Sequence, residues 1–409
     1  MKRGKAFNRL LDFYIGIPVL NLLACVRRQG VFPAHPRRVG LLFNPAIGDT
    51  LLGSAAVLEI RALYPEATLI LFAAKSNLAA AKLLPEVDSI KVLPITRPLE
   101  SIRVLRQSML DLMLDFTAWQ RLTAVYSLLS GARFRVGFER RKQHRHRGFD
   151  KTVPHLGDCH ELENIHRFTR SLGAQAALAP RLSVPGGPLP HAVLQGRQII
   201  VFHAWASGSQ RGMREWPDEY WTDLARQLDG PGRIFVLTCS PADKARCQEL
   251  CGQLVSQGTP AEILVGRDGL GEIARVLTHA EMLVSVNTGI MHLGAILGVP
   301  TVAINGPTAV HRWGPVGPRV ANACAADGTG GFLDLGFEFR GHCKDTMRKI
   351  HVDDVTRAVL ALGCIPDSRC AATNDQGGWL GAKSDALEVD ERHSRAWLTQ
   401  ISGRGMKPS

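Results

Sequence analysis

The sequence is poor in aromatic residues, which make up 6% of its 409 positions. It contains no zinc-finger spacing and no RNP-like motif, so nucleic acid is the least favoured partner for a chain with a formal net charge of +12. The excess of Lys and Arg instead favours an anionic membrane or a phosphorylated ligand. With 45% hydrophobic and 21% charged residues, the composition is typical of a globular protein, and the length suits two domains.

The nine cysteines form no CxxC pair and show no regular spacing. An odd, scattered set is typical of reduced thiols in the cytosol and not of a disulfide framework. The same scatter disfavours a metal site built from Cys and His. We therefore predict a cytoplasmic protein that binds no metal.

The sequence also lacks a clean apolar run of about 20 residues, which a transmembrane helix needs. The stretch 10–26 comes closest, but Asp12, Pro18 and Asn21 interrupt it. Its basic start also fits a signal peptide, although no clear cleavage site follows. We predict that residues 1–30 form an amphipathic helix at the inner-membrane surface. The alternative is a helix packed on the protein's own surface.

Short apolar runs alternate with helical segments along most of the chain. The runs expected to be strands begin near residues 38, 67, 89 and 111, and again near 198, 234, 263, 282 and 301. This alternation is typical of parallel, doubly wound sheets. A Pro- and Gly-rich stretch separates the two series and is expected to be a linker. The sequence thus predicts an α/β fold of two Rossmann-like domains facing a cleft, at 37–185 and 196–363, with a mobile tail at 366–409.

The stretch 284–308 predicts a strand, a tight turn, a short helix and a second strand. Asn287-Thr288-Gly289 favours a turn and a helix cap, and Gly298 ends the helix with a proline two residues later. In a parallel unit, free amides at such a helix start lie at the carboxyl edge of the sheet, where they bind phosphate. We predict that Asn287, Thr288, Gly289 and His292 hold a phosphate-bearing ligand. A structural role is the alternative for His292.

Polar residues after three other predicted strands are further candidates. Asp49 follows the first strand and either caps a helix or accepts a proton from a hydroxyl nucleophile. A polar loop in the second domain carries Ser207, Arg211 and Arg214, and the guanidinium group suits phosphate oxygens. Asp243 follows the next strand, where it would meet a ribose or cap the helix.

A basic segment spans residues 133–151. It holds eight Lys and Arg in nineteen residues, denser than an ordinary solvated loop, which is the alternative. We predict that it binds a polyanion through Arg133, Arg135, Arg140, Arg141 and Lys142.

Several motifs, in this order, resemble those of glycosyltransferase family 9, which includes the lipopolysaccharide heptosyltransferases. They are Ala46-Ile47-Gly48-Asp49, Leu63-Tyr64-Pro65, 111–115, 131–138, Trp216-Pro217, Asn287-Thr288-Gly289 to His292, and Gly306-Pro307-Thr308. The resemblance covers about 38–362. It implies a GT-B fold with an N-terminal acceptor domain and a C-terminal nucleotide-sugar domain. The implied activity is metal-independent, inverting transfer to lipopolysaccharide core or another envelope glycolipid.

The resemblance also implies roles for single residues. Asp49 matches the family's catalytic base, and the basic segment would bind an anionic glycolipid acceptor. Arg214 stands where the family usually has a lysine that contacts the diphosphate. Asn287 replaces an aspartate that contacts the donor sugar, so either the sugar differs from heptose or activity is impaired. The expected donor is a nucleotide-diphosphate sugar such as ADP-heptose, with no cofactor.

Two other classes of protein are alternatives. A catalytically impaired nucleotide-sugar or glycan-binding protein of the same fold would account for Asn287. A nicotinamide dehydrogenase fits less well, because the turn from Asn44 to Asp49 lacks GxGxxG.

Overall fold

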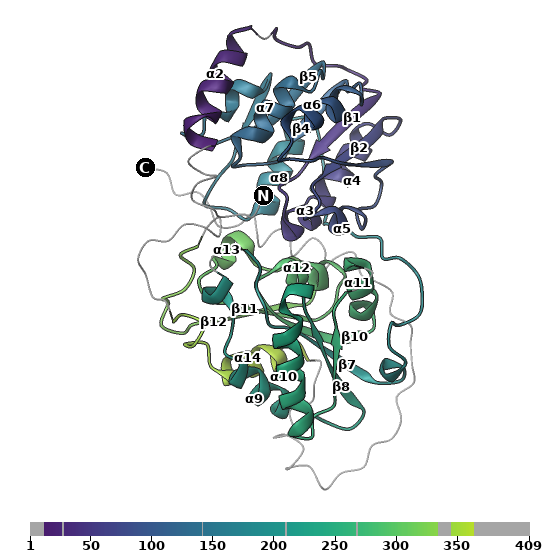
Figure 1. Cartoon of the computed structure of the whole chain (residues 1–409), viewed down its shortest axis with the longest axis vertical. Helices are drawn as coiled ribbons and strands as arrows, with labels where there is room; N and C mark the ends of the chain where they lie inside the picture. Colours follow the sequence, from purple (N-terminus) through teal and green to yellow (C-terminus); the bar gives the residue numbers. More distant parts are fainter. Residues whose placement is uncertain are drawn as a thin grey trace. The chain divides into compact units, whose positions relative to one another are not determined.

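The computed structural model describes residues 12–26, 28–140, 142–208, 211–266, 269–333 and 345–363. In these ranges the chain forms two six-stranded sheets, A and B, with helices packed around each (Figure 1). The predicted tail at 366–409 and the first eleven residues of the predicted N-terminal helix lie outside the described residues.

Sheet A is built from the first six strands, and every neighbouring pair is parallel, in the order β3-β2-β1-β4-β5-β6. The strands are β1 (Arg38–Leu42), β2 (Thr68–Ala73), β3 (Ser89–Val92), β4 (Leu112–Asp115), β5 (Phe134–Glu139) and β6 (Lys151–Pro154). The helices of this part, lobe A, are α2 (Gly16–Val26), α3 (Ile47–Leu52), α4 (Ser54–Leu63), α5 (Leu78–Ala81), α6 (Pro98–Arg106), α7 (Arg121–Leu129), η1 (Arg145–Gly148) and α8 (Glu161–Arg170).

Sheet B is also parallel throughout, in the order β12-β11-β10-β7-β8-β9. Its strands are β7 (Gln198–His203), β8 (Arg233–Thr238), β9 (Ala261–Leu264), β10 (Ala280–Val286), β11 (Thr301–Asn305) and β12 (Val320–Cys324). The helices of this part, lobe B, are η3 (Arg211–Arg214), α9 (Asp218–Leu228), η4 (Pro241–Asp243), α10 (Lys244–Ser256), α11 (Leu270–Thr278), α12 (Gly289–Ile296), α13 (Val310–Trp313) and α14 (Val352–Ala361), and the short η2 (Ala192–Leu194) precedes β7.

The two sheets share one topology. In each, the first and fourth strands of the series lie side by side at the centre, and the strand order reverses between them. These pairs are β1 with β4 and β7 with β10. Ligands of such sheets bind outside the carboxyl ends of the strands at this reversal point. The predicted α/β fold of two doubly wound sheets is confirmed.

The strands form because their residues are apolar on both faces. Four of the five residues of β1 and all five of β11 are buried, as expected for parallel strands covered by helices. One apolar cluster joins the lobes: Leu51 of α3 and Leu83 after α5 pack with residues that include Ile273 of α11 and Ile290 of α12. Both lobes belong to one compact unit.

A buried arginine also links the lobes. Arg312 of α13 is fully buried and donates to the main-chain carbonyls of Leu156 and Cys159 in lobe A, the first at 3.1 Å. Its Nη2 lies 3.2 Å from the carboxylate of Glu161, the first residue of α8. Glu161 also lies 3.0 Å from the ring of His155, so its charge is met from two sides.

Helix α2 packs on lobe A against α7 and η1. Leu20 is fully buried in a cluster with Ala124, Val125 and Phe149. Just before α2, the Asp12 carboxylate accepts hydrogen bonds from the first amides of α7 and forms an ion pair with Arg121 at 2.9 Å. The alternative from the sequence, packing on the protein's own surface, therefore holds for one face of this helix.

The opposite face of α2 is exposed and apolar. Pro18, Leu22 and Cys25 recur at helical spacing and lie within about 60° of one another on a helical wheel, and all three are exposed. Tyr14 and Ile15, just before α2, are 69% and 55% exposed. No helix in the described part of the chain is long and apolar enough to cross a membrane.

Much of the basic segment 133–151 is regular structure. It contains β5, η1 and the first residue of β6, and β5 and β6 are the last two strands of sheet A. The sequence gives a weak strand signal here because cations interrupt the apolar pattern. Strand β12, at the edge of sheet B, was likewise not predicted, and its alternation of exposed and buried residues is short.

Candidate functional site

Asp49 lies at the carboxyl edge of sheet A, in the first turn of α3. Its Oδ1 accepts a hydrogen bond of 2.8 Å from Nδ2 of Asn44, a residue that is 8% exposed and follows β1. A donor held at this distance orients the carboxylate. Asn44 was not among the predicted site residues, although a polar side chain directly after a buried strand is the signal that could have identified it.

Helix α3 meets α12 at two glycines. A Cβ on Gly289 would lie 2.5 Å from Cγ2 of Ile47, and a Cβ on Gly48 would lie 2.9 Å from Cδ2 of His292. Real side chains do not approach so closely, so both positions require glycine. This contact places Asp49, which adjoins Gly48, next to the start of α12.

The start of α12 carries polar atoms that have no partner in the part of the chain that the structure describes. Thr288 is the N-cap residue, but its side chain makes no capping hydrogen bond, and its Oγ1 is buried and unpaired. Nδ1 of the buried His292 is likewise unpaired. The first amides of any α-helix also lack partners within the helix. These groups form a set of donors suited to an anionic ligand.

Burial lowers the pKa of His292 to about 3, and the nearby His160 adds to this effect. The imidazole is therefore neutral at physiological pH and can donate a hydrogen bond from one nitrogen only. It contributes a dipole to the site and no charge.

Asn287 begins a chain of three asparagines across sheet B. Its Nδ2 donates to Oδ1 of Asn305 at 2.7 Å and to the carbonyl of Trp313 at 2.9 Å. Nδ2 of Asn305 in turn donates to Oδ1 of Asn322 at 2.8 Å and to the carbonyl of Ala303. A main-chain carbonyl can only accept, so the two carbonyls fix which way each amide faces. Asn287 is left with Oδ1 as the group that can meet a ligand.

The loop after β7 holds Arg214 near the same edge. Nη2 of Arg214 donates to the carbonyl of Ser207, whose side chain is exposed. The loop ends at the buried Trp216, whose indole donates to the carbonyl of Ile350 at 2.8 Å. The Trp-Pro motif therefore anchors the end of the loop in the core of lobe B. This anchor fixes the position of the main chain near Arg214.

Asp243 is engaged with protein groups in this structure. Arg211 pairs with it at 3.2 Å, and Ser240 donates to its other oxygen at 2.5 Å. Burial lowers the pKa of the neighbouring His203, at the end of β7, to about 4. Arg211 is half exposed and remains able to face a ligand.

The predicted acceptor residues divide into two groups. Arg140 and Lys142 follow β5 at the carboxyl edge of sheet A, the edge that carries Asp49, and Arg140 lies over the ring of Trp119 at 5.5 Å. Arg133 precedes β5 and so lies at the opposite edge, 3.3 Å from Asp111. Arg141 lies outside the described residues.

Arg135 is buried and forms an ion pair at 2.8 Å with Asp150, whose carboxylate is inaccessible to solvent. Arg145, from the same basic segment, is also fully buried, and it pairs with Asp115 of β4 at 3.1 Å. These arginines neutralise internal carboxylates. We therefore remove Arg133 and Arg135 from the acceptor site, the first for its position and the second for its burial.

Among the described residues, no three His, Cys, Asp or Glu side chains converge to hold a metal ion. The six cysteines described are all free thiols.

The sequence matches a known family over the second half of sheet A and all of sheet B. The model of glycosyltransferase family 9 (heptosyltransferase) matches residues 102–330, more than half of the chain. Lipopolysaccharide heptosyltransferase 1 of Salmonella typhimurium is 31% identical over 129 residues, 31% of this chain and 38% of that protein. The Pseudomonas aeruginosa enzyme of the same name is 36% identical over 113 residues, 28% of this chain and 30% of that protein. The chain thus spans about a third of the length of these relatives.

Solved structures share the fold along nearly their whole length. E. coli ADP-heptose lipopolysaccharide heptosyltransferase II has a TM-score of 0.66 at 20% identity, covering 80% of this chain and 98% of its own. A family 9 glycosyltransferase from Veillonella parvula has a TM-score of 0.67 at 18% identity, covering 82% and 99%. The two-sheet architecture is that of the GT-B heptosyltransferases. The protein belongs to glycosyltransferase family 9, the heptosyltransferase family.

Proposed function

We propose that the protein is an inverting, metal-independent glycosyltransferase that moves a sugar from a nucleotide diphosphate to a glycolipid acceptor. Asp49 accepts the proton of the acceptor hydroxyl, whose oxygen attacks the anomeric carbon. The bond between that carbon and the diphosphate oxygen breaks, and the diphosphate leaves with the electron pair. Cations and helix amides offset the charge that develops on it.

One observation carries the proposal. The close approach of Gly48 to His292 supports it, because Gly48 adjoins Asp49 and because Thr288 and His292, at the start of α12, carry polar atoms that have no partner among the described residues. A proton acceptor and an anion-binding helix start are the two parts that such a transfer needs. Arg214 and Arg211, on the loop after β7, would supply the cations.

The donor class follows from the relatives. Solved structures of E. coli heptosyltransferase WaaC contain ADP or ADP-2-deoxy-2-fluoro heptose. We propose an adenine nucleotide donor carrying heptose or a similar sugar. Asn287 would offer Oδ1 to the sugar as a neutral hydrogen-bond acceptor. Lipopolysaccharide core is the acceptor class that the names of the curated relatives suggest.

The substitution Asp49→Asn tests the mechanism. The amide keeps the size of the side chain but cannot take up the proton, so transfer from ADP-heptose should fall at least about 100-fold. ADP should still raise the melting temperature of the variant by as much as that of the unaltered protein. Full activity in the variant would rule out Asp49 as base. Nucleotide binding without turnover in the unaltered protein would favour the binding-protein alternative.

We further propose that α2 holds the enzyme on the cytoplasmic face of the inner membrane through its exposed face, Pro18, Leu22 and Cys25. An apolar helix face in a protein of +12 net charge suits an anionic lipid surface. Leu22→Glu should lower binding to phosphatidylglycerol vesicles in a sedimentation assay. The matched control is Val255→Glu, on the exposed face of α10, which should bind as the unaltered protein does. Equal binding by both variants would contradict this role.

A further inference from the structure

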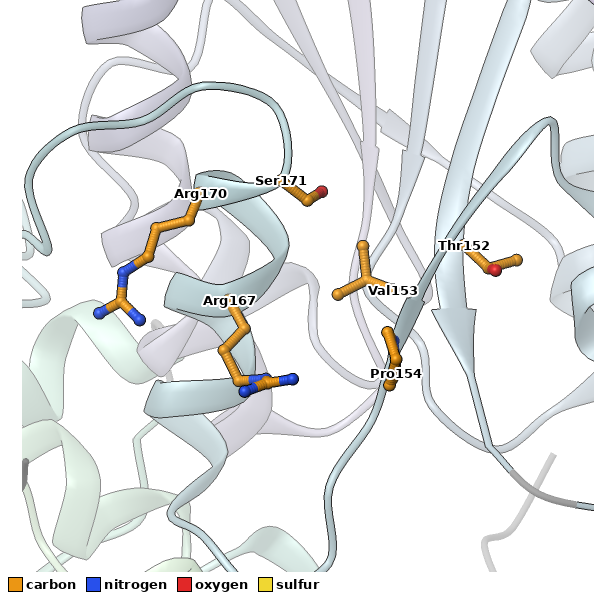
Figure 2. Close-up of a pocket in the computed structure, with 6 residues that line it drawn as sticks. All are labelled: Thr152, Val153, Pro154, Arg167, Arg170 and Ser171. Atoms are coloured by element: carbon orange, nitrogen blue, oxygen red, sulfur yellow. The ribbon is translucent and has the colours of Figure 1, made fainter. Parts of the chain in front are cut away.

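A cavity of about 430 Å³ lies on lobe A between α8 and the edge strand β6 (Figure 2). Its lining residues are Thr152, Val153, Pro154, Arg167, Arg170 and Ser171. Among the described strands β6 pairs only with β5, so its other side is open to this space. The lining holds two arginines and no carboxylate.

The two arginines differ in what they contact. Arg170 is paired with Glu163 at 2.8 Å, and its side chain points away from β6 (Figure 2). Arg167, three residues earlier on the same helix, points toward Pro154 across the cavity (Figure 2). Its guanidinium group makes no hydrogen bond or ion pair with the described residues, and its Nε is buried without a partner.

A partly buried guanidinium without a counter-charge is costly for a protein to keep. Most other arginines of this region form ion pairs: Arg135 with Asp150, Arg145 with Asp115 and Arg170 with Glu163. The nearby Lys151 adds a further positive charge and donates to the carbonyl of Ser171. Arg167 therefore offers the cavity a positive charge that suits an anionic group.

We propose that this cavity binds an oxyanion, a carboxylate or phosphate group, carried by the glycolipid acceptor. Pro154 ends β6 at the carboxyl edge of sheet A, the edge that carries Asp49. Three strand spacings separate β6 from β1, which is about 14 Å. An acceptor with its reactive hydroxyl at Asp49 would reach the cavity with a charged group at least about 14 Å from that hydroxyl. This role rests on the proposed function, whereas oxyanion binding at Arg167 does not.

Acceptor kinetics test the site. With ADP-heptose and a phosphorylated lipopolysaccharide core as substrates, Arg167→Gln should raise the KM for the acceptor about tenfold. The KM for the donor and kcat should change by less than about twofold, because Arg167 contacts neither the donor nor the reacting atoms. Arg167→Lys should recover part of the loss. The matched control is Arg226→Gln, at an exposed position of α9 in lobe B, whose acceptor KM should stay within about twofold.

Direct binding separates this site from the catalytic proposal. Calorimetric titration of the full chain with the same core oligosaccharide requires no turnover, so it remains informative if no transfer is found. Weaker binding in Arg167→Gln than in Arg226→Gln would support the site. Equal binding by both variants would overturn it. If inorganic phosphate alone binds at Arg167 while the affinity for the oligosaccharide is unaltered, the cavity belongs to free phosphate and the acceptor role is wrong.

Discussion

Asn287 donates both of its amide hydrogens inside the protein, to Asn305 and to the carbonyl of Trp313. An aspartate at this position would place a carboxylate oxygen against two acceptors. We expect Asn287→Asp to lower the free energy of unfolding by about 2 kcal/mol, because two buried hydrogen bonds are lost and like partial charges meet. Urea denaturation measures this change.

The other end of the asparagine chain supplies the control. Asn322 is exposed and only accepts from Asn305, so Asn322→Asp keeps the acceptor and should change the stability by less than about 0.5 kcal/mol. Equal stability of Asn287→Asp and the unaltered protein would show that the asparagine chain can rearrange. The amide of Asn287 is thus needed as a donor to Asn305. These hydrogen bonds account for an asparagine at this position, where the family resemblance implies an aspartate.

Asp49 and Thr288 were proposed from a local signal. Each follows a buried strand and lies at the start of a helix, as the sequence predicts from a few residues. Arg135 was misassigned because a run of cations does not reveal which side chains face inward along a strand. Asn44 and Arg167 were missed since their roles depend on contacts, with Asp49 in one case and with an edge strand in the other, that the spacing does not show.

At the scale of elements, helices α3 and α12 are held together by glycines. Gly289→Ala would place a methyl group 2.5 Å from Ile47, so the two helices must separate. We expect a loss of about 2 kcal/mol of stability and a lower affinity for ADP, because the start of α12 would shift. Thermal denaturation with and without ADP measures both effects.

A glycine in an open helix position provides the comparison. Gly252 of α10 is exposed and has nothing within 4 Å of an added Cβ. Gly252→Ala should therefore stabilise the protein by about 0.5–1 kcal/mol through helix propensity alone. If Gly289→Ala were equally benign, the close approach of α3 and α12 would not be required.

Elements with strong patterns were predicted well and weak ones were not. Strands β1, β7 and β11 begin at residues 38, 198 and 301, as predicted. Gly53 lies between α3 and α4, where a Cβ would lie 2.6 Å from the ring of Phe43. Strands β5 and β6 were missed because their cations obscure the apolar pattern, and pairing in the sheet outweighs that composition.

At the scale of the whole molecule, buried histidines make stability depend on pH. The pKa values of His203 and His292 are lowered by burial, to about 4 and about 3. Below pH 6.5 the unfolded chain takes up protons that the folded protein excludes, so stability is full above pH 6.5 and falls as the pH drops. Lowering the pH from 7.5 to 5.5 should reduce the free energy of unfolding by about 1.4 kcal/mol for each histidine. Urea denaturation at the two pH values measures this change.

Single substitutions assign this pH dependence. His292→Gln and His203→Gln should each reduce the slope of the free energy of unfolding against pH by the contribution of one histidine. This holds whatever their effect on the absolute stability. His35→Gln, at an exposed position, should leave the slope unchanged. An unaltered slope in the two buried variants would mean that other groups bind the protons.

Arg312 belongs to lobe B, yet its charge is met by Glu161 and by carbonyls of lobe A. Neither half can bury this side chain alone without leaving it unpaired, and Leu51 and Leu83 would lose their apolar cover. The halves should therefore melt in one calorimetric transition, with equal calorimetric and van't Hoff enthalpies. Fragments cut at residue 187 should be insoluble apart and complement each other when produced together, which would make the interlobe contact usable as a split-protein reporter.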